Sequence, residues 1–154
     1  MKAYYFSTIG KTLRYGDGRV IEEGITHSVE GTPVLCEHGL HASKRAIDAL
    51  HYAPGSYLWI VELSGEIVEG DDKVVATERT YIKGFNATNI LREFSRKVAL
   101  INIEKIKPYC FVEDFDIIIR YLETAAGSAA WSAMNEMLEE MIEEELKERQ
   151  TYLK

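Results

Sequence analysis

Short apolar runs rich in β-branched and aromatic residues, bounded by polar residues and glycines, recur in the first half of the chain and are typical of β-strands. The predicted strands are residues 3–8, 12–15, 19–21, 32–36, 56–63, 66–69, 74–76 and 80–82. Gly16, Asp17 and Gly18 separate two of these runs and predict a hairpin. Gly65 separates two others and predicts a bend or bulge.

One short helix interrupts the predicted strands. Residues 44–52 place Ile47 and Leu50 on one face, and Ser43 before them has the side chain of a helix N-cap. Pro54 follows and ends the helix.

Apolar residues recur at helical spacing in the second half, which predicts helices over residues 88–106, 112–124 and 128–150. The last one has an apolar stripe of Ala130, Met134, Met137, Leu138, Met141, Ile142 and Leu146, and a polar side of Glu139, Glu140, Glu143, Glu144 and Glu148. We therefore expect an α+β fold. A mostly antiparallel N-terminal sheet with one short helix precedes three helices, of which the last is long and acidic.

The composition is that of a globular protein, with 46% hydrophobic and 28% charged residues in a chain of 154. We expect an α+β domain over residues 1–126. We expect residues 127–154 to form a C-terminal acidic amphipathic helix that packs on this domain or on a partner.

Charge is unevenly distributed along the chain. The formal net charge is −7, and residues 127–154 hold seven glutamates against two lysines and one arginine. An acidic face repels phosphate backbones, so we expect no direct binding to duplex nucleic acid. A basic surface on a partner protein is the electrostatic complement, and methionines suit adaptable contacts. The predicted partner-binding residues are Met137, Glu140, Met141, Glu144 and Glu148.

The chain start has one charge and a very short apolar run, which is not a secretory signal. No stretch approaches the roughly 20 apolar residues that span a bilayer. Cys36 and Cys110 stand far apart in no repeating pattern, as expected of reduced thiols. We expect a cytoplasmic protein without membrane contact.

Residues 36–43, with the sequence CEHGLHAS, form the densest polar cluster. We interpret it as a strand end, a glycine turn and a helix start, which places His41 and Ser43 beside free helical N–H groups that suit an anion or a carbonyl. Three readings stay open: a structural His41 bonded to backbone, a metal site that adds Cys36, His38 and His51, and a catalytic or ligand-binding role. The spacing matches no standard zinc arrangement, so no metal is expected.

Three segments resemble an uncharacterised domain family of phage and prophage proteins. They are residues 36–43, 48–55 and 61–80, and residues 127–133 resemble the alanine- and tryptophan-rich tails of that family. The resemblance implies a phage origin, and therefore a host-cell cytoplasm, without implying an activity.

A second resemblance concerns Gly39 to Ser43 followed by Ala49 and Tyr52, which is similar to a segment of ADP-ribosyltransferases. An aromatic residue of that segment stacks on nicotinamide, so the resemblance implies this place for His41. Glu66 or Glu78 would then orient the ribose. The resulting candidate catalytic residues are His41, Ser43, Tyr52 and Glu78, and NAD is the cofactor in this case only.

Three functions follow from these features. The leading hypothesis is a small phage accessory protein that binds a host protein with a basic surface and inhibits a defence or nucleic-acid-handling component. The first alternative is an NAD- or nucleotide-binding enzyme of the ADP-ribosyltransferase type that uses a cleft at His41. The second is a homodimeric structural or assembly protein joined through the last helix.

Overall fold

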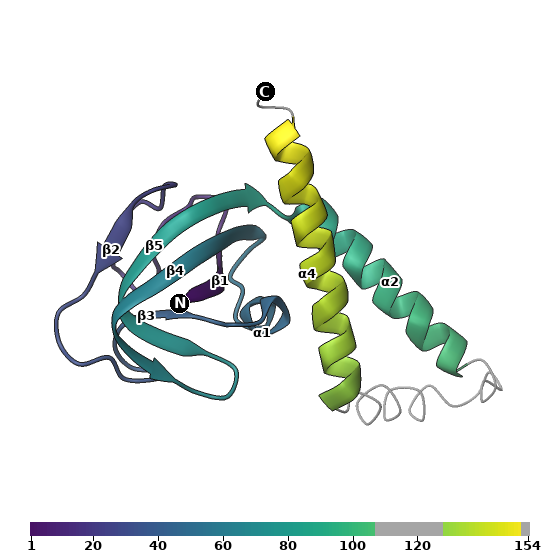
Figure 1. The fold of residues 1–154 in the computed structure, drawn as a ribbon, viewed down its shortest axis with the longest axis horizontal. Helices are drawn as coiled ribbons and strands as arrows, with labels where there is room; N and C mark the ends of the chain where they lie inside the picture. The colour runs from purple at the N-terminus through teal and green to yellow at the C-terminus, as the bar shows by residue number, and fades with distance from the viewer. Residues whose placement is uncertain (107–127, 152–154) are drawn as a thin grey trace. The chain divides into compact units, whose positions relative to one another are not determined.

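The computed structural model describes residues 1–106 and 128–151, and it has the predicted α+β architecture (Figure 1). The chain divides into two compact units, a sheet unit at Met1–Thr88 and a helical unit at Asn89–Lys154. The elements are β1 (Lys2–Ser7), β2 (Thr26–Ser28), β3 (Leu40–Ala42), α1 (Ala46–His51), β4 (Tyr57–Glu69), β5 (Val74–Asn86), α2 (Thr88–Ile106) and α4 (Ser128–Thr151). The predicted helix at 112–124 and the predicted boundary at 126 lie outside the described residues.

The sheet is antiparallel and has the strand order β1-β4-β5-β2, with β3 also paired to β5. Just after β3, Ser43 pairs with Tyr4 of β1. The two residues exchange both backbone hydrogen bonds, at 2.8 and 3.0 Å. The path β1-β4-β5-β3 therefore returns to β1, and the strands curve round one interior (Figure 1).

β4 and β5 form the long central pair of the sheet. Both are rich in β-branched and aromatic residues, which favour strands. The register shifts between Ser64 and Ile67, where Gly65 has a φ of 74°. The predicted bulge at Gly65 is confirmed, although the runs on either side belong to one strand. The interior is filled by Ala3, Leu13, Ile21, Leu40, Ala42, Trp59, Val61, Leu63, Val74, Ala76 and Tyr81.

Two predictions around His41 are wrong. Residues 32–36 form no strand, because a Val34–His38 bridge closes a turn there. Ser43 is not a helix cap. α1 begins three residues later, after Arg45, and has only six residues. The backbone bonds of Ser43 go to β1, so pairing in the sheet overrides its local capping preference. His41 consequently lies within a strand rather than beside a helix N-terminus.

The predicted hairpin at residues 12–21 is a loop closed by one bridge, between Thr12 and Val20. The N–H of Leu13 donates to the carbonyl of Arg19 at 2.9 Å, and no longer ladder follows. We call residues 12–20 the tyrosine loop, because Tyr15 lies at its tip.

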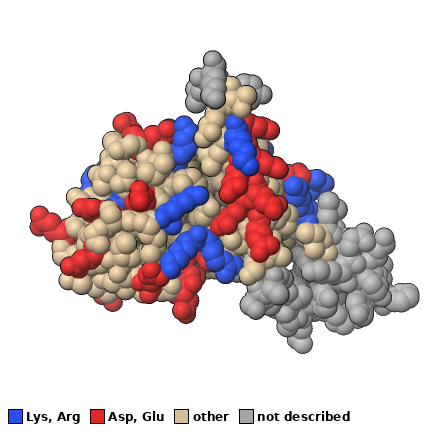
Figure 2. All heavy atoms as spheres, in the orientation of Figure 1, with Lys and Arg blue, Asp and Glu red and all other residues tan. Residues whose placement is uncertain are grey.

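The helical unit agrees with the predicted periodicity. The Asn86 side chain accepts the backbone N–H of Thr88 at 3.0 Å, which caps the start of α2. In α4, Leu138 and Ile142 are buried, while Glu140, Glu144 and other glutamates are exposed. Acidic side chains gather along α4 in Figure 2. Among the described residues, no helix is long and apolar enough to cross a membrane.

Candidate functional site

The sheet unit contains an open cavity of about 540 Å³. Its lining comes from β1, the tyrosine loop, the turn and strand at residues 36–43, and the end of α1 with Tyr52. Lys73, just before β5, and Arg79 within β5 complete it. The mouth of a closed or nearly closed sheet is a common place for a small-molecule site.

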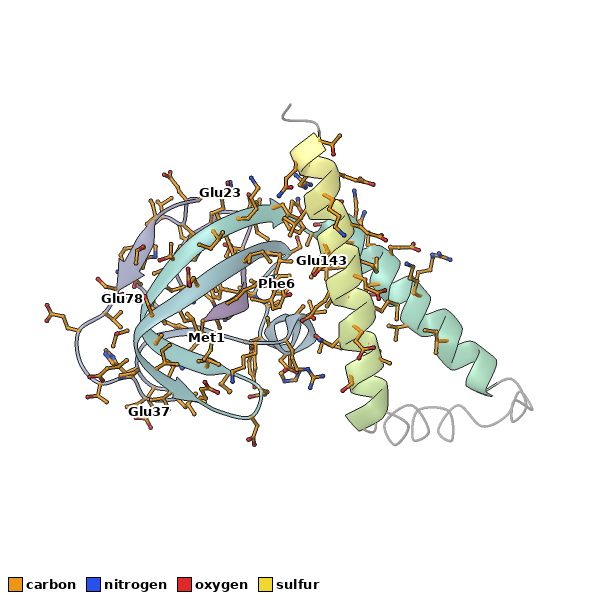
Figure 3. The ribbon with its side chains drawn as sticks, in the orientation of Figure 1. Met1, Phe6, Glu23, Glu37, Glu78 and Glu143 are labelled. Atoms are coloured by element: carbon orange, nitrogen blue, oxygen red, sulfur yellow. The ribbon has the colours of Figure 1, made fainter. Side chains whose placement is uncertain are left out.

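Three of the four predicted catalytic residues line this cavity: His41, Ser43 and Tyr52. Glu78 does not. Its carboxylate is exposed and accepts the hydroxyl of Ser64 at 2.8 Å (Figure 3). Successive side chains of a strand point to opposite faces, so the strand that turns Arg79 inward turns Glu78 outward.

His41 is bonded on both ring nitrogens. Its Nε2 accepts the backbone N–H of Cys36 at 3.0 Å, and its Nδ1 donates to the carbonyl of Gly39 at 3.2 Å. Burial is the main cause that lowers the pKa of His41, and the charges of Arg79 and Lys73 act in the same direction. A neutral ring therefore holds the turn at 36–39 in place and forms part of the cavity wall.

Arg79 is the polar residue that the sequence reading missed. Its side chain is only 2% exposed. Nε and Nη2 donate to the hydroxyl of Tyr81 at 3.0 and 2.7 Å, and Nη1 donates to the backbone carbonyl of His41. The guanidinium carbon lies 3.8 Å from the ring centre of Tyr5. Within the described part of the chain, no carboxylate forms an ion pair with it.

Tyr81 links Arg79 to a buried histidine. The Tyr81 oxygen accepts two N–H groups of Arg79, so its own hydrogen is donated to Nδ1 of His27, at 3.2 Å. The pKa of His27 is lowered, first by burial and then by the charges of Arg19 and Arg79. The ring of His27 is therefore neutral, as its role of acceptor requires. Three strands share this chain of hydrogen bonds, which fixes the guanidinium in the interior.

Lys73 provides a second cation at the cavity. Its Nζ lies 4.3 Å from the ring centre of Tyr52 and donates to the Cys36 sulfur at 3.3 Å. The hydroxyl of Tyr52 donates in turn to Asp72. Contacts with Tyr52, and next with Cys36, raise the pKa of Lys73, so it is charged at neutral pH.

Hydrogen bonds from the guanidinium of Arg19 hold the tyrosine loop in place. Its Nε and Nη2 each donate to a carboxylate oxygen of Asp17 at 2.8 Å, and Nη1 donates to the carbonyl of Ser28 at 2.9 Å. The hydrogen bond from Arg19 is the main cause that lowers the pKa of Asp17 to about 2. The negative charge of Asp17, which lines the cavity, is thereby balanced by the positive charge of Arg19.

No cluster of three or more His, Cys, Asp or Glu side chains that could hold a metal ion occurs within residues 1–106 and 128–151. Cys36, His38, His41 and His51, the set considered from the sequence, thus form no such cluster. His38 instead bonds to the carbonyl of Glu30 at 2.7 Å.

Searches of curated proteins and of solved structures found no match for the chain. A family model does match, that of a domain of unknown function (DUF7666), over residues 8–93, which is more than half of the chain. This stretch includes every residue that lines the cavity except those of β1. The chain belongs to this family, a domain family of unknown function (DUF7666).

Proposed function

We propose that the sheet unit binds a small anionic ligand, a carboxylate or a phosphate, in the cavity, with Arg79 as the anion-binding residue. The supporting observation is a buried guanidinium that lines an open cavity without a carboxylate partner. A buried charge without a counter-charge costs several kcal/mol. The contacts with Tyr5, Tyr81 and His41 offset part of this cost, and a bound anion would supply the missing charge.

The guanidinium has donors to spare for such a ligand. Arginine carries five N–H groups, and three hydrogen bonds from Arg79 go to protein acceptors. Two N–H groups therefore remain for a ligand, which is the number that a carboxylate or phosphate accepts in a bidentate contact.

The surroundings favour an anion as well. The protein carries a net charge of −7, yet Arg14, Lys73 and Arg79 all line the cavity. Two carboxylates face these cations, and one of them, Asp17, is already paired with Arg19. The cavity is therefore a locally cationic site on an acidic protein.

Binding, rather than group transfer, fits the groups around the cavity. His41 has both ring nitrogens occupied and a lowered pKa. Neither Glu66 nor Glu78, the carboxylates that an ADP-ribosyltransferase mechanism would use here, lines the cavity. We therefore propose a ligand-binding domain in which His41, Ser43 and Tyr52 are wall residues.

The test is calorimetric titration of the full chain with inorganic phosphate, ribose 5-phosphate and citrate. We expect at least one anion to bind, and Arg79→Lys to weaken it about tenfold or more, because lysine keeps the charge but loses the planar fork. Lys83→Gln is the control. It removes a cation from the same strand, where Lys83 pairs with Glu23 away from the cavity. Equal binding by Arg79→Lys, or no binding of any anion to the wild type, would overturn the proposal.

We propose, as a second candidate, that the chain is a phage-encoded accessory protein whose α4 binds a basic surface of a host protein. Glu140, Glu144 and Glu148 are exposed and follow one another at intervals of four residues. Like charges at this spacing destabilise a helix, and a cationic partner would relieve that repulsion. Met137 and Met141, both half-buried, lie beside them on the helix.

This second candidate is tested by retention of host-lysate proteins on the immobilised full chain. The comparison variant replaces Glu140, Glu144 and Glu148 with glutamine. A protein retained by the wild type, released by salt and not retained by the variant supports the proposal. Equal retention on both chains contradicts it.

A further inference from the structure

Two exposed tyrosines line the cavity, and each is accompanied by a cation. Tyr15, in the tyrosine loop, is 94% exposed, and the guanidinium carbon of Arg14 lies 4.9 Å from its ring centre. Tyr52, after α1, has Lys73 at 4.3 Å. Single exposed apolar residues need no explanation, but two aromatic rings at one cavity are a feature of binding sites.

The backbone at Tyr15 is strained. Its φ is +59°, in the left-handed region that residues other than glycine rarely adopt, and Gly16 and Gly18 of the same loop use this region at 82° and 70°. A glycine at position 15 would relieve this strain. The folded chain therefore carries a tyrosine where the backbone favours glycine.

Folding offers little compensation for this strain. In the described part of the chain, the Tyr15 side chain contacts Arg14, which is itself exposed. The loop around it is held independently, by the Thr12–Val20 bridge and by the bonds of Arg19. Strained residues on a fixed loop beside a cavity are typical of ligand contacts.

We infer that the ligand is an anion that also carries a planar ring, with its anionic group on Arg79 and its ring stacked on Tyr15. This inference rests on the proposed anion-binding function and names the ligand class. An exposed ring face backed by a guanidinium is a stacking platform for planar heterocycles and arenes. The cavity volume of about 540 Å³ is within the range of small-molecule sites and has room for both groups.

The experiment compares three probes on the full chain by calorimetric titration: AMP, which has both groups, ribose 5-phosphate, which lacks the ring, and adenosine, which lacks the charge. The variants are Tyr15→Gly, Tyr15→Phe and Arg79→Lys. We expect AMP to bind the wild type about tenfold or more tighter than ribose 5-phosphate, because stacking of a base on an aromatic ring has this effect. Tyr15→Gly should abolish the difference, leave ribose 5-phosphate binding unchanged and leave the melting temperature no lower.

The outcomes separate this inference from the proposed function. Equal affinities for AMP and ribose 5-phosphate in the wild type, both weakened by Arg79→Lys, would refute the stacking of a ligand ring on Tyr15. The proposed anion site at Arg79 would still be supported. Loss of the AMP advantage in Tyr15→Phe, which keeps the ring, would also overturn stacking. Binding of adenosine as tight as that of AMP would overturn the anion site, and the inference with it.

Discussion

The sheet unit and α4 carry their charges in opposite ways. The sheet unit has one arginine in its interior, fixed by Tyr81 and by the backbone of His41. α4 has seven glutamates, most of them exposed to solvent. Coulomb interactions are weak and screened in water and strong in a low-dielectric interior. A single buried cation should therefore influence stability and ligand choice more than the whole acidic side of the helix.

The comparison also separates two kinds of specificity. The interior cation is held in one geometry, so it can distinguish ligands by shape and by hydrogen-bond number. The exposed glutamates have no such fixed geometry and attract any basic surface at a rate that depends on salt. A change in the interior should therefore alter folding and ligand binding together, whereas a change on α4 should alter mainly association and have only a small effect on stability.

The largest effect is expected for Tyr81→Phe. The lost hydroxyl accepts two N–H groups of Arg79 and donates to His27, so its removal leaves buried donors and an acceptor without partners. We expect a loss of about 2–4 kcal/mol in the free energy of unfolding, measured by urea denaturation. Tyr15→Phe removes the same group from a 94% exposed side chain and should change stability by less than about 0.5 kcal/mol. Equal effects of the two substitutions would show that the interior network contributes no stability.

The next effect is a loss of stability in mild acid. Burial lowers the folded-state pKa of both His27 and His41, so the unfolded chain binds protons first as pH falls through about 6.5. The free energy of unfolding should be fully present above that pH. Below it, the free energy should fall until the folded-state pKa is reached, by up to about 1.4 kcal/mol per pH unit for each histidine.

Urea denaturation between pH 7.5 and 5 measures this slope, and His27→Gln is the matched variant. The variant should lose the part of the slope that His27 contributes and keep that of His41. A stability that does not change over this range, or a slope that is the same in both chains, would mean that the histidines are not protonated on unfolding as their burial requires.

The sequence predicted those parts of the fold that long periodic segments encode. α2 and α4 were found from their apolar spacing, β1 from its β-favouring composition, and the bulge from Gly65, whereas each of the two long strands was predicted as two shorter runs. The short strand β3 was missed because its three residues gain their structure from distant partners, with Leu40 opposite Ala76. Ser43 was misread for the same reason, since its bonds to Tyr4 lie 39 positions away in the chain. Local propensity yields to such contacts.

The candidate site was found in part. His41, Ser43 and Tyr52 were chosen from one polar cluster and do meet at the cavity. Arg79 was overlooked because the polar run at 77–79 separated two predicted strands. The alternation of a single continuous strand would have placed Arg79 on the same face as Tyr81, which is a signal for an inward-facing charge. Arg79 donates its hydrogen bonds to acceptors at positions 41 and 81. Residue spacing alone does not reveal the acceptor at position 41.

The smallest effect is expected on α4, for the variant with glutamine at positions 140, 144 and 148. Three like-charge pairs at four-residue spacing disappear, because Glu136 also precedes Glu140 by four residues, and each pair costs an isolated helix about 0.2–0.5 kcal/mol. The variant should therefore be as stable as the wild type or more stable, by less than about 1.5 kcal/mol in urea denaturation. The difference should vanish in 1 M NaCl, where the screening length is about 3 Å. A loss of stability that persists in high salt would show that these glutamates make contacts that stabilise the fold. The contrast between the hydrogen-bonded Arg79 of the interior and the exposed glutamates of α4 would then be wrong. Greater stability combined with lost partner retention would show instead that the glutamates of α4 lower the stability of the helix but are needed for partner binding, as expected of an interaction surface.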